Sequence, residues 1–275
     1  MADQISNIST TQLFNYTLNL ADNSLIMGHR LSEWTGHGPI LEQDIAMSNI
    51  ALDLVGQSRN FYQYAAQIKN KITPSGDGGK GTPSVDRGTT EDSLAYLRDA
   101  DEFKNIILVE LPNGDWGYTI AKLFFFSTWQ FLLYQKLIPS SDAQLSAIAE
   151  KSLKEVTYHV RWSSEWMIRL GDGTDESHQR IQKAIDEIWN YTAELFLPSA
   201  FENACYENNI GVAVSEIKND WTQKINDVLK EATLTSPAAV SSPLLAGKEG
   251  RHTSFLQEIL DDMQYLQRTY PGCKW

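Results

Sequence analysis

The sequence predicts an all-α protein with a four-helix bundle at its core and additional helices packed around it. Apolar residues recur at helical spacing along most of the 275 residues, and no stretch alternates convincingly as a strand. Residues 116–137 are apolar on nearly every face, which is typical of a helix at the centre of a bundle. Eight Trp, eleven Tyr and ten Phe residues supply the bulk that a sizeable core needs.

Two long helices are expected in the first quarter of the chain. The first runs from about Thr11 to Trp34 and ends at the turn Gly36–Pro39. The second starts near Leu41 and continues to about Ile68, with apolar residues at the three-four spacing of a buried face. Residues 73–90, rich in Gly, Ser, Thr, Pro and Asp, predict an exposed, flexible loop. Because both flanks resemble parts of one bundle, we expect a single domain over residues 1–275.

The rest of the chain predicts six more helices. One begins near Glu91 and ends at Leu111–Gly114, and the apolar helix 116–137 follows it. The capping sequence Pro139–Asp142 starts the next helix, which runs to Leu170. Three further helices are expected at about 176–197, 214–231 and 254–269.

Composition limits the class of partner. The formal net charge of −12 disfavours binding to nucleic acid or to an anionic membrane surface. Cys205 and Cys273 stand in neither a metal-type nor a redox-type spacing. The polar start Met1–Gln4 lacks the pattern of a signal peptide, and the longest apolar run, Leu123–Tyr134, is too short and too polar to span a bilayer. These features favour a cytoplasmic protein without nucleic-acid or membrane partners.

A di-iron site would require ligands that this sequence does not supply. Helical bundles build such a site from two single carboxylates and two Glu-x-x-His pairs. Three of the five histidines have no acid three residues earlier, and the other two, His178 and His252, follow acids in Gly-containing segments. Two of the helices would each have to supply a single carboxylate. The first helix offers Asp22 near its middle, whereas helix 116–137 contains no acidic residue and has Ser127 at its middle. The full ligand set is therefore absent.

A degenerate pattern remains on the second and fifth predicted helices. Asp53 and Gln57 are spaced like Glu155 and His159, and an Arg follows two residues later in both helices, which suggests a duplicated helix pair. Spacing of four places Glu155 and His159 on one face. These residues form either a remnant metal site or a buried Glu–His hydrogen bond, and the ligand count favours the hydrogen bond.

Even with Asp22, the positions Asp53, Glu155 and His159 are too few to balance the charge of two iron ions. We therefore expect no catalytic, cofactor-binding or metal-binding residue in this chain. Asp53, Glu155 and His159 are interpreted as degenerate remnants of a metal site.

Several blocks carry a family resemblance, and together they cover nearly the whole chain in order. They are residues 31–37, 50–60, 108–114, 154–159, 170–174, 247–253, 263–268 and 271–275. These blocks resemble the C subunits of bacterial ring-1,2-phenylacetyl-CoA epoxidases, and the C-terminal blocks are the most specific.

The resemblance implies a ferritin-like fold and a role in aerobic phenylacetate catabolism. In this family a related A subunit holds the di-iron centre and epoxidises the aromatic ring of phenylacetyl-CoA, using oxygen and electrons from a reductase subunit. A small B subunit helps assembly. The C subunit is a paralogue of A without working ligands. The resemblance therefore implies a non-catalytic structural subunit that pairs with A and stabilises it, with a homodimer as the alternative for the isolated chain.

Two other functions remain open from the residues alone. The chain could be a metal-dependent oxygenase subunit in its own right, using the reduced ligand set Asp53, Glu155 and His159. It could also be a storage or regulatory bundle with no link to an oxygenase. The stretch Gly247–Thr253 offers a conceivable phosphate contact, although its expected role is to position the last helix.

Overall fold

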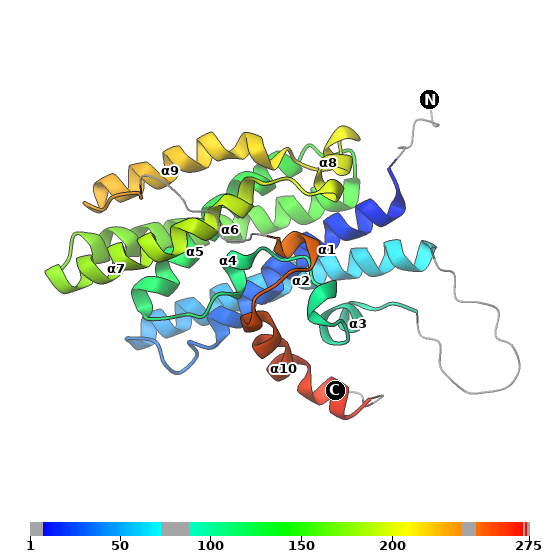
Figure 1. The fold of residues 1–275 in the computed structure, drawn as a ribbon, viewed down its shortest axis with the longest axis horizontal. Helices are drawn as coiled ribbons and strands as arrows, with labels where there is room; N and C mark the ends of the chain where they lie inside the picture. Colours follow the sequence, from blue (N-terminus) through cyan, green and yellow to red (C-terminus); the bar gives the residue numbers. More distant parts are fainter. Residues whose placement is uncertain (1–7, 73–87, 238–245, 272, 274–275) are drawn as a thin grey trace, which may run out of the picture.

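The computed structural model describes residues 8–72, 88–237, 246–271 and 273, and its regular structure is helical, as predicted (Figure 1). Four long helices form the core: α1 (Thr10–Ser32), α2 (Leu41–Ile72), α5 (Trp116–Leu137) and α6 (Ala143–Gly171). α1 packs along α2, and α5 packs along α6. The predicted ferritin-like bundle is confirmed. Residues 73–87, which make up most of the predicted loop, lie outside the described part of the chain.

α5 is the central helix of the bundle. Its bounds agree with the prediction, and Asp115 caps its start by accepting a hydrogen bond from the Tyr118 amide at 2.9 Å. Phe124, Phe125 and Phe126 are all buried although they point in different directions around the helix. Since neighbouring helices cover α5 on every side, its sequence can be apolar all round. Within the described residues, no helix is both long enough and apolar enough to span a membrane.

α6 packs on two sides. One row of buried residues, including Leu145, Ala149 and Val156, belongs to the main core. A second row contains Trp162 and Trp166, and both rings pack edge-on against Trp116 at the start of α5. The Trp166 indole N–H also donates to Gln43 Oε1 on α2 at 2.9 Å. The second row thus faces α2 and the start of α5.

The single helix predicted between Glu91 and Leu111 is wrong. The structure contains three short pieces instead: α3 (Glu91–Tyr96), a 3₁₀ turn (Ala100–Glu102) and α4 (Ile107–Glu110). Main-chain N–H groups between and at the start of these pieces donate to buried side chains of other elements: Lys104 to Asp22, Ile106 to Asn23, and Ile107 to Glu194. These tertiary hydrogen bonds replace the helical ones that local sequence favours.

The C-terminal elements pack around the core. α7 (Asp175–Ile188) continues as a 3₁₀ helix (Trp189–Phe196), which confirms the helix predicted at 176–197 and shows its tightened end. The short α8 (Ala200–Glu207) was not predicted. The last two predicted helices are confirmed as α9 (Lys218–Glu231), preceded by a 3₁₀ turn, and α10 (Ser254–Thr269). α7 and α9 pack against α5 and α6.

Candidate functional site

A layer of polar side chains crosses the interior where α1, α2, α5 and α6 meet. It consists of Ser24, Asp53, Gln57, Ser127, Gln130, Tyr134, Glu155, His159 and Ser163, and is called the polar layer below. Seven of these nine residues are buried, whereas Glu155 is half-buried and the Asp53 side chain is 37% exposed. Since a buried polar atom is unfavourable without a partner, the hydrogen bonds of the layer determine what it can do.

Two reciprocal hydrogen bonds join α2 to α6. His159 Nε2 lies 3.0 Å from Asp53 Oδ2, and the Gln57 amide donates to Glu155 Oε2 at 2.9 Å. The acid of each helix thus contacts the residue four positions beyond the acid of the other helix, as antiparallel packing requires. This exchange accounts for the similar spacing seen in the sequence. The predicted Glu155–His159 hydrogen bond is wrong, because each residue bonds to α2 instead.

Gln130 joins three helices at the centre of the layer. Its Nε2 lies 3.2 Å from Ser24 Oγ on α1, 3.2 Å from Gln57 Oε1 on α2 and 3.0 Å from the Tyr134 hydroxyl on α5. Burial raises the pKa of Tyr134, so its hydroxyl stays neutral and able to donate. Neutral amides and hydroxyls therefore occupy the middle of the bundle.

Little charge remains on the layer. Asp53 and Glu155 are its carboxylates and His159 is its imidazole. Across the part of the chain that the structure describes, no three His, Cys, Asp or Glu side chains come close enough together to hold one metal ion. His159 Nδ1 and Gln130 Oε1 are buried and have no protein partner among the described residues.

Asp22, the candidate from the first helix, has a different role. Its carboxylate is fully buried and accepts hydrogen bonds from Arg98 Nη2 at 2.5 Å, from Arg98 Nη1 at 3.1 Å and from the Lys104 amide at 2.8 Å. The Tyr62 hydroxyl donates to it as well. Asp22 therefore fixes α3 and the following segment against α1 and α2.

Sequence reasoning missed the neutral members of the polar layer. Ser24, Gln130 and Tyr134 are not metal ligands by type, so a search for carboxylates and imidazoles passes over them. The available signal was the interruption of the apolar helix 116–137 by Ser127 and Gln130. A polar residue inside a helix that is buried all round has to find a partner within the bundle.

A second buried polar cluster fixes the segment Ala246–Thr253 and is called the C-terminal anchor. Three buried carboxylates receive its donors: Glu202 from Lys248 Nζ at 2.9 and 3.0 Å, Glu110 from the Thr253 amide at 2.7 Å, and Glu194 from the Gly247 amide at 2.7 Å. His252 Nδ1 also lies 2.9 Å from Glu110. The phosphate contact considered for this stretch is thus not supported, because Lys248 and His252 are engaged by carboxylates.

Lys122 on α5 is buried, and no acidic side chain among the described residues forms an ion pair with it. Its Nζ lies 2.6 Å from the Leu111 carbonyl oxygen and 3.2 Å from Asn113 Oδ1, which holds the turn before α5. Burial, assisted by repulsion from Arg30, lowers the pKa of Lys122 to about 7. This lysine can therefore lose its proton near neutral pH.

Replacing Lys122 with Met is expected to change how stability depends on pH. Between about pH 7 and pH 10.5 the unfolded chain holds a proton on Lys122 that the folded chain has lost, so this group makes the free energy of unfolding rise with pH. The gain, on the order of a few kcal/mol, should be absent in Lys122→Met. Urea unfolding of both proteins at pH 7.0 and 9.5 measures the difference, and parallel pH profiles would contradict this assignment.

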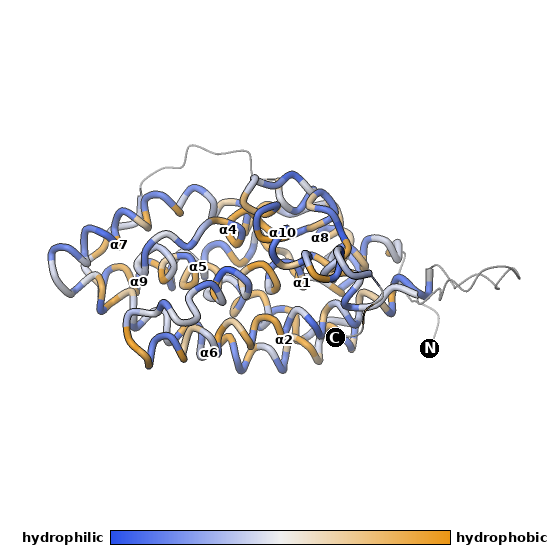
Figure 2. Tube along the Cα trace, turned by 90° about the horizontal axis from the view of Figure 1, so that it is seen from below, coloured by the Kyte–Doolittle hydropathy of each residue, from blue (hydrophilic) through white to orange (hydrophobic). Residues whose placement is uncertain are grey.

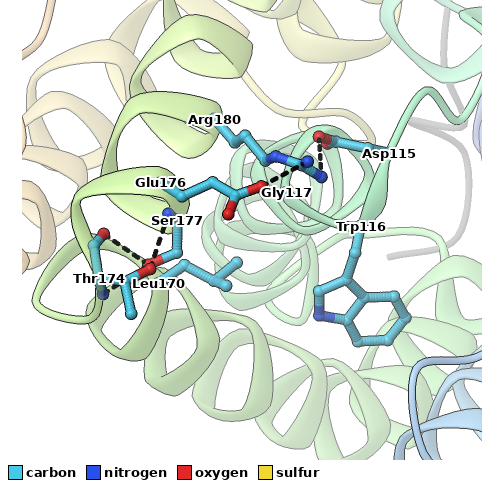
Figure 3. Close-up of a pocket in the computed structure, with 8 residues that line it drawn as sticks. All are labelled: Asp115, Trp116, Gly117, Leu170, Thr174, Glu176, Ser177 and Arg180. Atoms are coloured by element: carbon cyan, nitrogen blue, oxygen red, sulfur yellow. Dashed lines mark hydrogen bonds and ion pairs between the residues drawn. The ribbon is translucent and has the colours of Figure 1, made fainter.

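A surface pocket of about 280 Å³ lies between the starts of α5 and α7 (Figure 3). Arg180 crosses it, with Nη2 2.6 Å from Glu176 Oε1 and Nη1 3.9 Å from Asp115 Oδ2. Trp116 lines the opposite side. The pocket shares no residue with the polar layer, and two carboxylates already neutralise its cation.

The fold and the polar layer together define a ferritin-like helical bundle with few ionisable groups at its centre. The whole chain, residues 1–275, matches the model of a family described as Phenylacetic acid catabolic protein. The chain belongs to this family. It is similar to the C subunit of the 1,2-phenylacetyl-CoA epoxidase of Escherichia coli (strain K12), with 43% identity over 264 residues, which are 96% of this chain and 99% of that protein. The resemblance noted in the sequence is confirmed.

Proposed function

We propose that this chain is the non-catalytic structural subunit of a multicomponent di-iron monooxygenase that epoxidises the aromatic ring of phenylacetyl-CoA in aerobic phenylacetate catabolism. It pairs with the catalytic A subunit and stabilises it, and the B and reductase subunits complete the complex. The similarity to the C subunit of an epoxidase supports the complex. We place this complex in the cytoplasm.

The observation that carries the non-catalytic role is the position of the Gln130 side chain. Its amide nitrogen lies among oxygens of α1, α2 and α5, where a metal-binding bundle would direct ligands inward. An N–H group cannot ligate a cation, and it occupies acceptor atoms that would otherwise face one. Gln57 likewise directs its amide N–H toward Glu155, the acid of α6.

Charge balance supports the same proposal. Two iron ions need several carboxylates and imidazoles, whereas the polar layer offers Asp53, Glu155 and His159. Asp22 is committed to Arg98. The donor set does not fit a di-iron centre, so the iron and the substrate chemistry belong to the partner subunit.

The test is co-expression with the paralogous subunit of the same organism that carries two Glu-x-x-His pairs. This chain alone is expected to contain no stoichiometric iron and to turn over no phenylacetyl-CoA. The pair should hold iron and, with reductase, produce the epoxide. One or two iron atoms per chain, or turnover by this chain without the paralogue, would establish the alternative of an oxygenase subunit with a reduced ligand set.

Glu155→Gln gives a matched variant for the same assay. A Gln at this position keeps an oxygen that accepts the Gln57 hydrogen bond and removes the ionised carboxylate that a metal would need. Turnover of the assembled complex should stay within about twofold of the unmodified complex, since catalytic groups lose far more when removed. A large loss of turnover with assembly intact would refute the structural role.

A further inference from the structure

Two carboxylates set the direction of the hydrogen bonds in the polar layer. α2 and α6 lie side by side along the lower edge of Figure 2, with α1 and α5 above them in the interior. Asp53 on α2 and the half-buried Glu155 on α6 are the members of the layer that solvent reaches. A carboxylate oxygen accepts hydrogen bonds and donates none, so each acid determines which atom of its partner carries the hydrogen.

Glu155 fixes the orientation of two glutamine amides in turn. The Gln57 amide nitrogen donates to Glu155 Oε2 at 2.9 Å, which turns Gln57 Oε1 toward α5. Gln130 Nε2 donates to that oxygen at 3.2 Å, so the Gln130 amide is oriented as well. Since an amide side chain donates only through its nitrogen, Gln130 Oε1 is an acceptor. This oxygen is buried, and no described residue donates to it.

Asp53 fixes the tautomer of His159 in the same way. His159 Nε2 lies 3.0 Å from Asp53 Oδ2, so Nε2 carries the hydrogen. A second hydrogen on Nδ1 would be a buried donor without a partner among the described residues, which is unfavourable. In the neutral ring Nδ1 is an acceptor. The His159 side chain is fully buried, so the polar layer ends in a second buried acceptor.

The two acceptors belong to side chains at the same level of the bundle. α5 and α6 are joined by a short turn and run antiparallel, and Ser127 Oγ on α5 lies 3.3 Å from Ser163 Oγ on α6. Gln130 follows Ser127 by three residues, which is about 4.5 Å along α5. His159 precedes Ser163 by four residues, which is about 6 Å along α6 in the same direction. Both side chains also bond to α2, so they face the same part of the interior.

We infer that one buried water molecule bridges His159 Nδ1 and Gln130 Oε1. A molecule that joins two acceptors has to supply two donors, and water does so. Buried waters in proteins typically bond to polar groups that are otherwise unpaired. Ser127 and Ser163, next to this pair along the two helices, are small residues with hydroxyl groups, which suit the lining of a water site. The water connects α6 to the Gln130 amide, and through it to α1 and α2.

A cation is a less suitable occupant of this position. Gln130 Oε1 and the imidazole Nδ1 of His159 are both neutral acceptors, and burying a charge between neutral groups costs far more than burying a hydroxyl. An apolar molecule would leave both acceptors unpaired. Water satisfies both acceptors and adds no charge to the centre of the bundle.

A high-resolution crystal structure of the unmodified chain tests the inference directly. We expect density for one water molecule within about 3.2 Å of both His159 Nδ1 and Gln130 Oε1. In solution, NMR of the chain with ¹⁵N-labelled histidine should show His159 as a neutral ring with its hydrogen on Nε2. Direct contact between the two side chains, a metal ion between them, no density at this position, or a ring that carries both hydrogens would each overturn the inference.

His159→Phe gives a matched variant, with His29→Phe as its control. Phe keeps an aromatic ring and removes the acceptor, so the density of the bridging water should be lost. His29 is half-buried on α1, and replacing it should leave the water in place. A water that keeps its position in His159→Phe would contradict the bridge. If His159→Phe does not fold, the crystal structure and the NMR spectrum of the unmodified chain still decide the question.

Discussion

Lys248→Met is expected to lower the free energy of unfolding by about 3–5 kcal/mol, the usual effect of removing one partner from a buried ion pair. Lys248 is 5% exposed and Glu202 is 2% exposed, and the Lys248 Nζ also donates to the Leu197 carbonyl oxygen at 2.9 Å. Met fills similar space without the charge. The loss therefore comes from the Glu202 carboxylate, which stays buried without its cation. Urea denaturation at pH 7 measures it.

A double variant, Lys248→Met with Glu202→Gln, provides the control. The Gln side chain keeps the size of Glu202 and an oxygen that accepts from Ser199, but it carries no charge. Most of the lost stability should return, because no unpaired ion is then buried. If the double variant is no more stable than Lys248→Met alone, packing and not charge pairing holds the C-terminal anchor.

The four core helices could be predicted because their signals are local. The apolar pattern of residues 116–137, a capping acid before it and a turn after it define α5 without knowledge of any neighbour. The central position of α5 also follows, since a helix that is apolar all round can be stable only when it is surrounded.

The segment 91–110 could not be predicted, because its conformation depends on side chains far away in the chain. Asp22 and Glu194 accept its main-chain N–H groups, and both lie more than 80 residues from their partners. Local propensity favours a helix there, but these buried carboxylates have to be satisfied, and extended backbone presents N–H groups to them.

In the candidate site too, the sequence predicted what local helical spacing determines and missed what depends on distant residues. The sequence predicted that Glu155 and His159 share one face of their helix, which helical spacing alone determines, and grouped Asp53 with them as a remnant position. It did not predict that Asp53 pairs with His159 and Glu155 with Gln57. Such pairs depend on how one helix is shifted along the other, and the period of a single helix carries no information on that shift.

The two polar clusters hold the bundle together in different ways. In the polar layer the amide of Gln130 connects α1, α2 and α5 with neutral hydrogen bonds. Buried carboxylates are found instead at the edges of the core, where each has a cation or several N–H donors. This distribution keeps repulsive charge out of the centre.

Arg98→Leu is expected to lower the free energy of unfolding by about 3–5 kcal/mol, since it leaves the Asp22 side chain buried beside only uncharged donors. Arg98 is 7% exposed, and its guanidinium also donates to the Glu102 carbonyl oxygen at 3.0 Å and lies 4.0 Å from the centre of the Phe103 ring. The loss of stability should be largest in the segment that Asp22 holds. Hydrogen exchange of the Lys104 amide, which donates to Asp22, should accelerate more than exchange in α5.

A double-mutant cycle with Asp22→Asn separates the charge pair from the packing of Arg98. Asn keeps a carbonyl oxygen for the Lys104 amide, so the double variant should be more stable than Arg98→Leu alone, with a coupling energy on the order of 1–3 kcal/mol. Strictly additive losses would mean that Asp22 and Arg98 stabilise the fold independently. Coupling would show that the one acid that α1 could have offered to a metal is used to hold α3 and the segment after it.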